Sequence, residues 1–167
     1  IHGYMYPVKE KLPEIFFLKG ADCWGWATWK RGWDLFNPNG KELLDKIEKQ
    51  GFQKEFDFNG AYPYTNMLRD QIESLNNSWA VRWYASTFLN DKLTLYPGRS
   101  LINNIGVDDS GVHCTSDNKY ENNIVDSSVE IITTLTEEDP AIRKIISEFL
   151  KNNGSRSIIA KIKDFMT

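Results

Sequence analysis

Four tryptophans within ten residues constrain the fold of this chain more than any other feature of its sequence. They stand in the segment 20–33, at Trp24, Trp26, Trp29 and Trp33. Side chains of this size bury so much surface that a small domain must arrange its core or a binding surface around them. The cluster is therefore either an aromatic wedge in the core or a platform whose indole faces stack on the C–H faces of pyranose rings. Gly25, between two of the indoles, predicts close approach of another strand or of a ligand.

Three further groups of residues can carry chemistry. Asp22 offers a carboxylate that can accept sugar hydroxyl protons, with a turn or cap role as the alternative. Arg82, between Trp79 and Trp83, either binds a phosphate or carboxylate of a ligand or forms a structural salt bridge. His113, after a glycine-bounded acidic loop, is either a packed histidine or a metal ligand.

Composition narrows the possible partners. The chain of 167 residues is 41% hydrophobic, which predicts one globular domain with a real core. Its net charge of −3 argues against nucleic acid, because neutralising several phosphates requires an excess of positive charge. We expect a cytoplasmic protein, since neither a membrane span nor a basic, apolar leader is present. The start at Ile1 rather than at a methionine predicts a fragment or a processed product, and Cys23 and Cys114 predict two reduced thiols.

The pattern of apolar residues predicts an α+β fold that is mainly helical with a few short strands. Strands are expected at residues 15–18, 93–96 and 100–102, and residues 52–64 are expected to be a loop. The expected helices span 24–33, 41–50, 64–75, 79–89, 140–151 and 158–165, with Asn77 or Ser78 as an N-cap and a break at 152–154. We divide the chain into a region 1–114, a polar linker 115–128 and a helical tail 129–167.

Several common catalytic signatures are absent from the sequence. There is no phosphate-binding loop, G-x-G-x-x-G, G-x-S-x-G or H-E-x-x-H motif, and no D-x-D pair for a metal–diphosphate complex. The usual nucleotide-binding, hydrolase and metalloprotease classes therefore have no support.

Four ordered motifs, spread between Gly3 and Cys114, together carry a resemblance to a known family. They are GADCWGWATWKRGW at 20–33, NSWAVRWYAS at 77–86, YPGRSL at 96–101, and NIG at 104–106 through GVHC at 111–114. The chain resembles the C-terminal region of bacterial family-two glycosyltransferases of GT-A fold, some of which carry "hemolytic protein" names. The resemblance implies an acceptor-side piece of such an enzyme, present without the Rossmann-like half that holds the nucleotide sugar and its metal.

The resemblance also implies roles for individual residues. The tryptophan-rich segment would lie in the sugar pocket, and the start of the helix near Asn77 would lie where relatives offer a catalytic Asp. Because an asparagine cannot take a proton from an acceptor hydroxyl, Asp22 is the substitute catalytic base. His113 would complete a metal or diphosphate site. The implied substrate-binding residues are Trp24, Trp26, Asn77, Trp79, Arg82 and Arg99.

The implied reaction transfers a sugar from a nucleotide sugar to a glycan or lipid-linked acceptor, with inversion and with help from Mn²⁺ or Mg²⁺. We expect the fragment alone to be inactive, and its uncovered face predicts a homodimer. The intact enzyme would work in the cytoplasm or at the inner face of the membrane. The alternative is a noncatalytic module that binds carbohydrate or another protein, which the aromatic richness and the missing D-x-D pair also fit.

Overall fold

Two short strands, far apart in the sequence, form an antiparallel sheet in this computed structural model, which describes residues 1–103, 124, 128–131 and 135–164, with side chains as far as Asn153. Strand β1 is Ile15–Leu18 and strand β2 is Thr94–Pro97. Their register places Phe16 opposite Tyr96, and the two rings stack with centroids 5.9 Å apart. The predicted strand at 15–18 is confirmed, and the one at 93–96 is confirmed with a shift of one residue.

Helices α2 and α5 begin where their capping residues predict. Helix α2, Gly40–Lys49, starts after Asn39, whose side chain accepts a hydrogen bond from the Glu42 amide. Helix α5, Trp79–Leu89, starts after Ser78, whose hydroxyl accepts from the Val81 amide at 3.3 Å. Both helices bury an apolar face, and α5 runs through the centre of the core.

Helices α3 and α4 connect these two. Helix α4, Tyr64–Ile72, confirms the helix predicted from residue 64 and ends three residues earlier than expected. Helix α3, Gln53–Phe56, lies where a loop was predicted, and that prediction is wrong for these four residues. The reason is tertiary, because the Phe56 side chain is fully buried and its carbonyl accepts a hydrogen bond from the Tyr84 hydroxyl at 2.9 Å.

Helix α6, Pro140–Asp164, is one continuous helix. It begins as predicted, with the Asp139 carboxylate accepting from the amides of residues 141 and 142. The predicted break at 152–154 is wrong, because the helix continues through these residues. The side-chain amide of Asn153 donates to the Phe149 carbonyl one turn earlier in the helix. Residues Ile142, Ile146 and Leu150 of α6 share the core with region 1–103. The division at 114 and 128 stays a prediction.

The predicted helix at 24–33 is wrong over its first six residues. Helix α1 is only Lys30–Trp33, and Gly25 adopts a left-handed conformation with φ of +58°. The Gly25 carbonyl accepts from the Gly3 amide at 2.8 Å, and the Ala27 amide donates to the Ile1 carbonyl at 3.0 Å. Pairing with the N-terminal segment thus replaces the helical hydrogen bonds, and close approach of another segment was one of the two alternatives predicted from Gly25.

The predicted strand at 100–102 is also wrong. The Leu101 amide donates to the Gly3 carbonyl, and the Ser100 hydroxyl accepts from the Met5 amide at 3.1 Å. These residues therefore lie against the N-terminal segment as irregular backbone.

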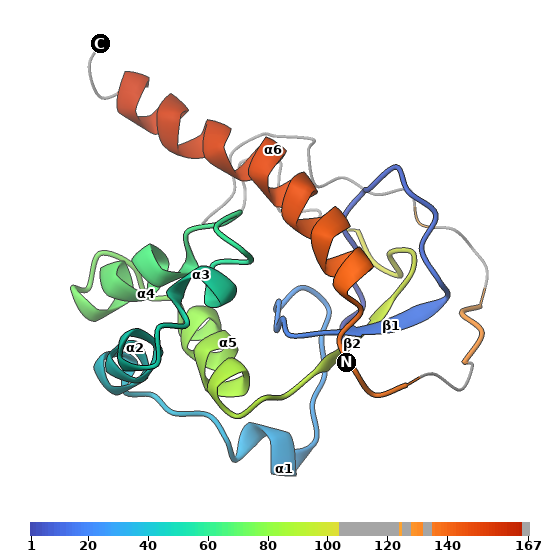
Figure 1. Ribbon diagram of the computed structural model, residues 1–167, viewed down its shortest axis with the longest axis horizontal. Helices are drawn as coiled ribbons and strands as arrows, with labels where there is room; N and C mark the ends of the chain where they lie inside the picture. The colour runs from blue at the N-terminus through green and yellow to red at the C-terminus, as the bar shows by residue number, and fades with distance from the viewer. Residues whose placement is uncertain (104–123, 125–127, 132–134, 165–167) are drawn as a thin grey trace.

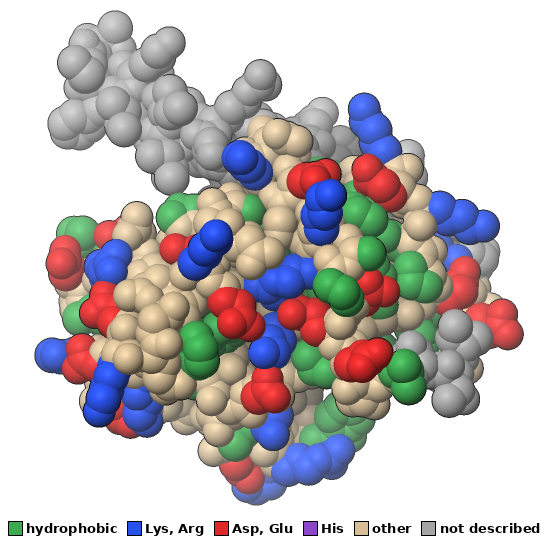
Figure 2. Space-filling view, in the orientation of Figure 1, with side chains coloured by type: hydrophobic (Ala, Val, Ile, Leu, Met, Phe, Trp, Pro, Cys, Tyr) green, Lys and Arg blue, Asp and Glu red, His purple; other side chains and the backbone are tan. Residues whose placement is uncertain are grey.

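The elements together make a mixed α+β arrangement that is mainly helical, as predicted. Figure 1 shows helices α2 to α5 grouped on one side and the sheet on the other, with α6 beginning beside the sheet. Positive and negative side chains are interspersed over the face drawn in Figure 2. Within the described part of the chain, no helix combines the length and apolar character needed to cross a bilayer.

Candidate functional site

Asp22 is held by two tyrosines that reach it from different parts of the chain. Its Oδ2 atom accepts a hydrogen bond from the Tyr6 hydroxyl at 3.1 Å and another from the Tyr96 hydroxyl at 3.0 Å. Burial, together with the charge of Asp22, raises the pKa of both tyrosines well above the ordinary value, so both remain protonated donors. The carboxylate is thereby fixed in orientation, and no hydrogen bond from the described residues reaches its Oδ1 atom.

The backbone beside Asp22 is shaped to admit one of these tyrosines. A Cβ atom on Gly20 would lie 2.8 Å from the Tyr96 hydroxyl oxygen. A larger residue at position 20 would therefore displace the hydroxyl from its place against Asp22. Gly20 ends the apolar run of β1, so the turn after the strand also sets the position of the carboxylate.

Asp22 lines a cavity of about 210 Å³ with mostly apolar walls. The cavity is bounded by the segment 20–24, by α4 and α5, and by Leu150 of α6. Its aromatic lining residues are Tyr6, Trp24, Phe58, Tyr62, Tyr64 and Tyr84. Apolar walls with a few convergent polar groups are typical of small-ligand sites. The volume lies below the usual range for drug-sized ligands, so the cavity suits a single small ring.

The Cys23 thiol lines this cavity as well. Burial and the charge of Asp22 raise its pKa to about 12. The thiol is therefore protonated near neutral pH and is a poor nucleophile or metal ligand there.

Asp22 and its neighbour Ala21 also line a second, larger cavity of about 530 Å³. Three indoles bound it, from Trp26, Trp29 and Trp83. Two residues thus belong to the walls of both cavities, and Asp22 is the acidic one.

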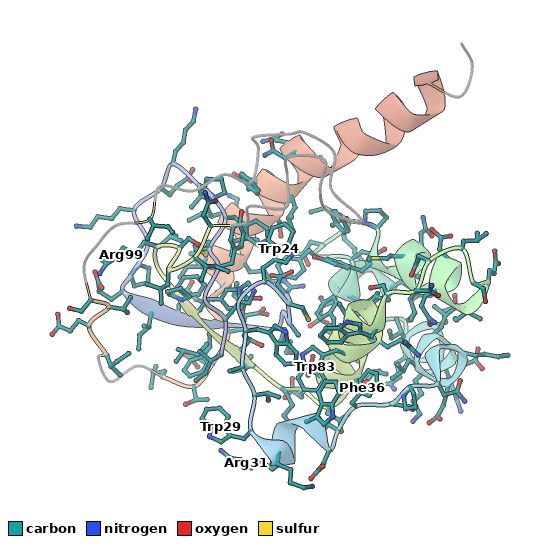
Figure 3. All side chains as sticks on the ribbon, turned by 180° about the vertical axis from the view of Figure 1, so that it is seen from behind. Trp24, Trp29, Arg31, Phe36, Trp83 and Arg99 are labelled. Atoms are coloured by element: carbon teal, nitrogen blue, oxygen red, sulfur yellow. The ribbon has the colours of Figure 1, made fainter. Side chains whose placement is uncertain are left out.

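Trp26 and Trp83, two of the three indoles on the larger cavity, belong to a cluster of four with Trp33 and Trp79. The centroid of Trp26 lies 5.6 Å from those of Trp79 and Trp83, and that of Trp33 lies 5.3 Å from Trp83. Trp33 contacts both Phe36 and Trp83, and Figure 3 shows Trp29 and Arg31 beside α1. Within the tryptophan segment, Trp24 and Trp26 pack against the core as the wedge interpretation predicts, whereas Trp29 is 55% exposed. A sugar-stacking platform stays a prediction.

Of the six substrate-binding residues predicted from the sequence, two line a cavity and four do not. Trp24 lines the smaller cavity, and Trp26 lines the larger. Trp79 contacts Trp26 without lining either cavity, and the exposed Asn77 precedes the cap of α5, also outside both. His113 lies outside the described residues.

The two predicted arginines have structural contacts away from Asp22. Arg82 donates to the Pro38 carbonyl at 3.0 Å and lies over the Phe36 ring. Arg99 pairs with Glu14 at 3.0 Å and donates to the Ser128 carbonyl. Neither arginine lines either cavity, and Figure 3 shows Arg99 well away from Trp83 and Phe36.

Sequence reasoning missed the tyrosines that complete the site. Tyr96 is 74 residues from Asp22, and only the pairing of β1 with β2 brings it near. The alternation of side chains in residues 93–96 predicted a strand that places Tyr96 on one of its faces, and this was the sequence signal that pointed toward Tyr96. Two cations on the larger cavity, Arg31 and Lys92, were missed as well.

The described residues contain no group of three His, Cys, Asp or Glu side chains that could hold a metal ion. The expected Mn²⁺ or Mg²⁺ therefore stays a prediction. Comparisons with models of protein families, with curated proteins and with solved structures give no match.

Proposed function

We propose that this chain is the acceptor-side part of a sugar-nucleotide-dependent glycosyltransferase of GT-A type. The observation that carries the proposal is the position of Asp22, a carboxylate on the walls of two cavities that each contain aromatic side chains. Two sugars can meet at such a residue, one in each cavity. The four ordered sequence motifs support the same assignment.

Asp22 has the chemistry of a general base at that position. A carboxylate can accept several hydrogen bonds, so the two tyrosine bonds to Oδ2 leave Oδ1 for a hydroxyl of the acceptor. The hydroxyl proton passes to Asp22 as the hydroxyl oxygen attacks the anomeric carbon of the donor sugar. The bond from that carbon to the diphosphate breaks at the same time, and the nucleoside diphosphate leaves with the electron pair. Attack opposite the leaving group inverts the anomeric centre.

The aromatic walls provide the positioning that this step needs. Trp24 and the tyrosines around the smaller cavity offer flat faces for the apolar side of a sugar ring, and Trp26 does so in the larger cavity. Holding the two reactants in register can supply several kcal/mol of the barrier reduction. Binding of the nucleotide and of its metal belongs to a separate half in this proposal.

Transfer by the intact protein tests the proposal. The protein is incubated with a panel of sugar nucleotides and glycan acceptors in the presence of Mn²⁺ or Mg²⁺, and release of nucleoside diphosphate is measured. We expect release with at least one donor and a large loss in the Trp24→Ala and Trp26→Ala variants. Absence of both transfer and hydrolysis with every donor would overturn the proposal.

A noncatalytic carbohydrate-binding module is the second candidate, and the exposure of Trp29 at the larger cavity favours it. Exposed indoles on a surface are a common means of holding sugars without chemistry. This candidate predicts that the chain by itself binds glycans, that Trp24→Ala or Trp26→Ala abolishes binding without unfolding, and that the intact protein transfers nothing. Transfer that depends on Asp22 would exclude it.

A further inference from the structure

Two positive side chains on the larger cavity form no ion pair with an acid among the described residues. Arg31 comes from α1, and Lys92 comes from the segment between α5 and β2. The acids nearest to them in sequence are already engaged. Asp34 pairs with Lys30 at 2.8 Å, and Asp91 pairs with Lys19 at 2.9 Å. The positive charges of Arg31 and Lys92 are therefore left to face the cavity and the solvent.

The charge on the cavity wall is unbalanced. Among the described side chains that line the cavity, those of Arg31 and Lys92 are positive and that of Asp22 is the one negative. Oδ2 of Asp22 already accepts from two tyrosine hydroxyls. A ligand that enters with its own negative charge would pair with these cations, whereas a neutral ligand would leave them to water.

The same wall offers apolar faces next to these charges. The guanidinium carbon of Arg31 lies 4.9 Å from the centre of the Trp29 ring, which holds the arginine beside an indole that is half exposed. Trp26 and Trp83 line the cavity with it. Figure 3 shows Trp29 and Arg31 together at the α1 edge of the molecule. The cavity therefore combines ring-stacking surfaces with an anion-binding edge.

We propose that the larger cavity binds a saccharide that carries a negative charge, with the sugar ring against the indoles and the anionic group on Arg31 and Lys92. The shared chemistry is a cluster of anionic oxygens attached to a pyranose. It can come from the carboxylate of a uronic acid in a glycan or from the phosphate of a sugar phosphate. This inference rests on the proposed function, which requires a sugar in the cavity, and adds that the sugar carries a negative charge.

The volume and the chemistry of the wall agree with this ligand class. A cavity of about 530 Å³ falls within the usual range for ligand sites, and it exceeds what a single small anion would fill. A guanidinium group can make two parallel hydrogen bonds to a carboxylate or a phosphate, which gives direction as well as attraction. Both cations are exposed, so replacing them removes charge without opening a hole in the core.

Binding of four probes by the chain tests the inference. The probes are cellobiose, its glucuronic-acid counterpart cellobiouronic acid, glucose 1-phosphate and inorganic phosphate, each titrated by NMR at low salt. The variants are Arg31→Gln and Lys92→Gln, and Lys41→Gln is the matched control. Lys41 lies on α2 and pairs with Asp45 at 3.0 Å, so its substitution removes one positive charge at a place away from the cavity. Thermal unfolding checks that each variant folds.

We expect at least one charged sugar to bind roughly tenfold or more tightly than cellobiose and than inorganic phosphate. Each cavity variant should remove most of that preference, Lys41→Gln should keep it, and added salt should weaken it. Preference for cellobiouronic acid identifies a uronic acid as the source, and preference for glucose 1-phosphate identifies a sugar phosphate.

The other outcomes separate the two proposals. Equal binding of neutral and charged sugars overturns the charge inference and leaves the glycan function standing. Inorganic phosphate that binds as tightly as the charged sugars overturns it as well, since the ring would then contribute nothing. If no sugar binds in either cavity and the intact protein transfers none, both the charge inference and the proposed function are wrong.

Discussion

Replacing Arg143 with methionine should destabilise the protein strongly, because this arginine joins α6 to the rest of the core. Its side chain is 7% exposed and pairs with Glu138, 19% exposed, at 2.8 Å. It also donates to the Glu55 carbonyl at 2.6 Å, and its guanidinium carbon lies 4.4 Å from the centre of the Phe58 ring. Methionine keeps most of the aliphatic stem and removes all three interactions.

The size of the effect follows from these contacts. Each charge-assisted hydrogen bond contributes about 1.5–3 kcal/mol, and removing one partner of a buried ion pair costs about 3–5 kcal/mol. Glu138 keeps one donor, the Lys19 amide at 2.8 Å, which offsets part of its loss. We therefore expect the free energy of unfolding to fall by about 3–5 kcal/mol. For a domain of this size, each kcal/mol lost lowers the melting temperature by about 2–4 °C.

Urea unfolding followed by circular dichroism measures this change. The matched control is Lys144→Met on the same helix, because Lys144 is exposed and reaches Glu148 only at 4.0 Å. That variant should change the free energy of unfolding by less than about 0.5 kcal/mol. The effects of Arg143→Met and Glu138→Gln should be far from additive in the double variant. A loss below about 1 kcal/mol for Arg143→Met would refute the reasoning.

Three further predictions concern single residues. Burial lowers the pKa of His2 below 6.5. As the pH drops from about 7 to about 5, the unfolded chain therefore binds a proton at His2 before the folded protein does, and the free energy of unfolding should fall. Urea unfolding at several pH values checks this, and His2→Gln should flatten the dependence; an unchanged slope would contradict it. In a Cys114→Ser background, Cys23, with a pKa of about 12, should react with iodoacetamide at pH 8 roughly 100-fold or more slowly in the folded protein than in urea, and similar rates would show an accessible thiolate. Ser78→Ala should cost about 1 kcal/mol in the same unfolding assay by removing the cap of α5, whereas Ser78→Asp should cost little; equal losses would argue against capping.

Local signals in the sequence were enough to predict α2, α5 and β1. In each, the apolar period and the capping or turn residue agree, and no distant contact competes. Helix α1 shows the opposite case. The tryptophans repeat at helical spacing, yet the backbone of residues 24–29 pairs with Ile1 and Gly3, and nothing local in the segment specifies that partner. The spacing was therefore correct for bringing indoles together and wrong as evidence of a helix.

The candidate site was predictable only in part, for the same reason. Asp22 and the neighbouring tryptophans were identified from their composition and spacing. The hydroxyl of Tyr96 reaches Asp22 through the pairing of two strands, and Lys92 comes to the same cavity as Arg31 because of the path of the chain after α5. Such contacts depend on packing across the whole chain. Arg82 and Arg99 each donate to a backbone carbonyl, which agrees with the structural alternative stated for Arg82, and their role in substrate binding stays a prediction.

The most direct test of the central claim is the rate of sugar transfer by the intact protein when Asp22 is changed to asparagine. Asparagine keeps the shape of the side chain and cannot take the proton. We predict a fall in kcat of roughly 100-fold or more, with the dissociation constant for the acceptor within about threefold of the unchanged protein. Asp34→Asn, an exposed acid on the nearby surface, should leave kcat unchanged. A kcat that Asp22→Asn leaves intact would contradict the claim that this carboxylate takes the proton of the acceptor hydroxyl.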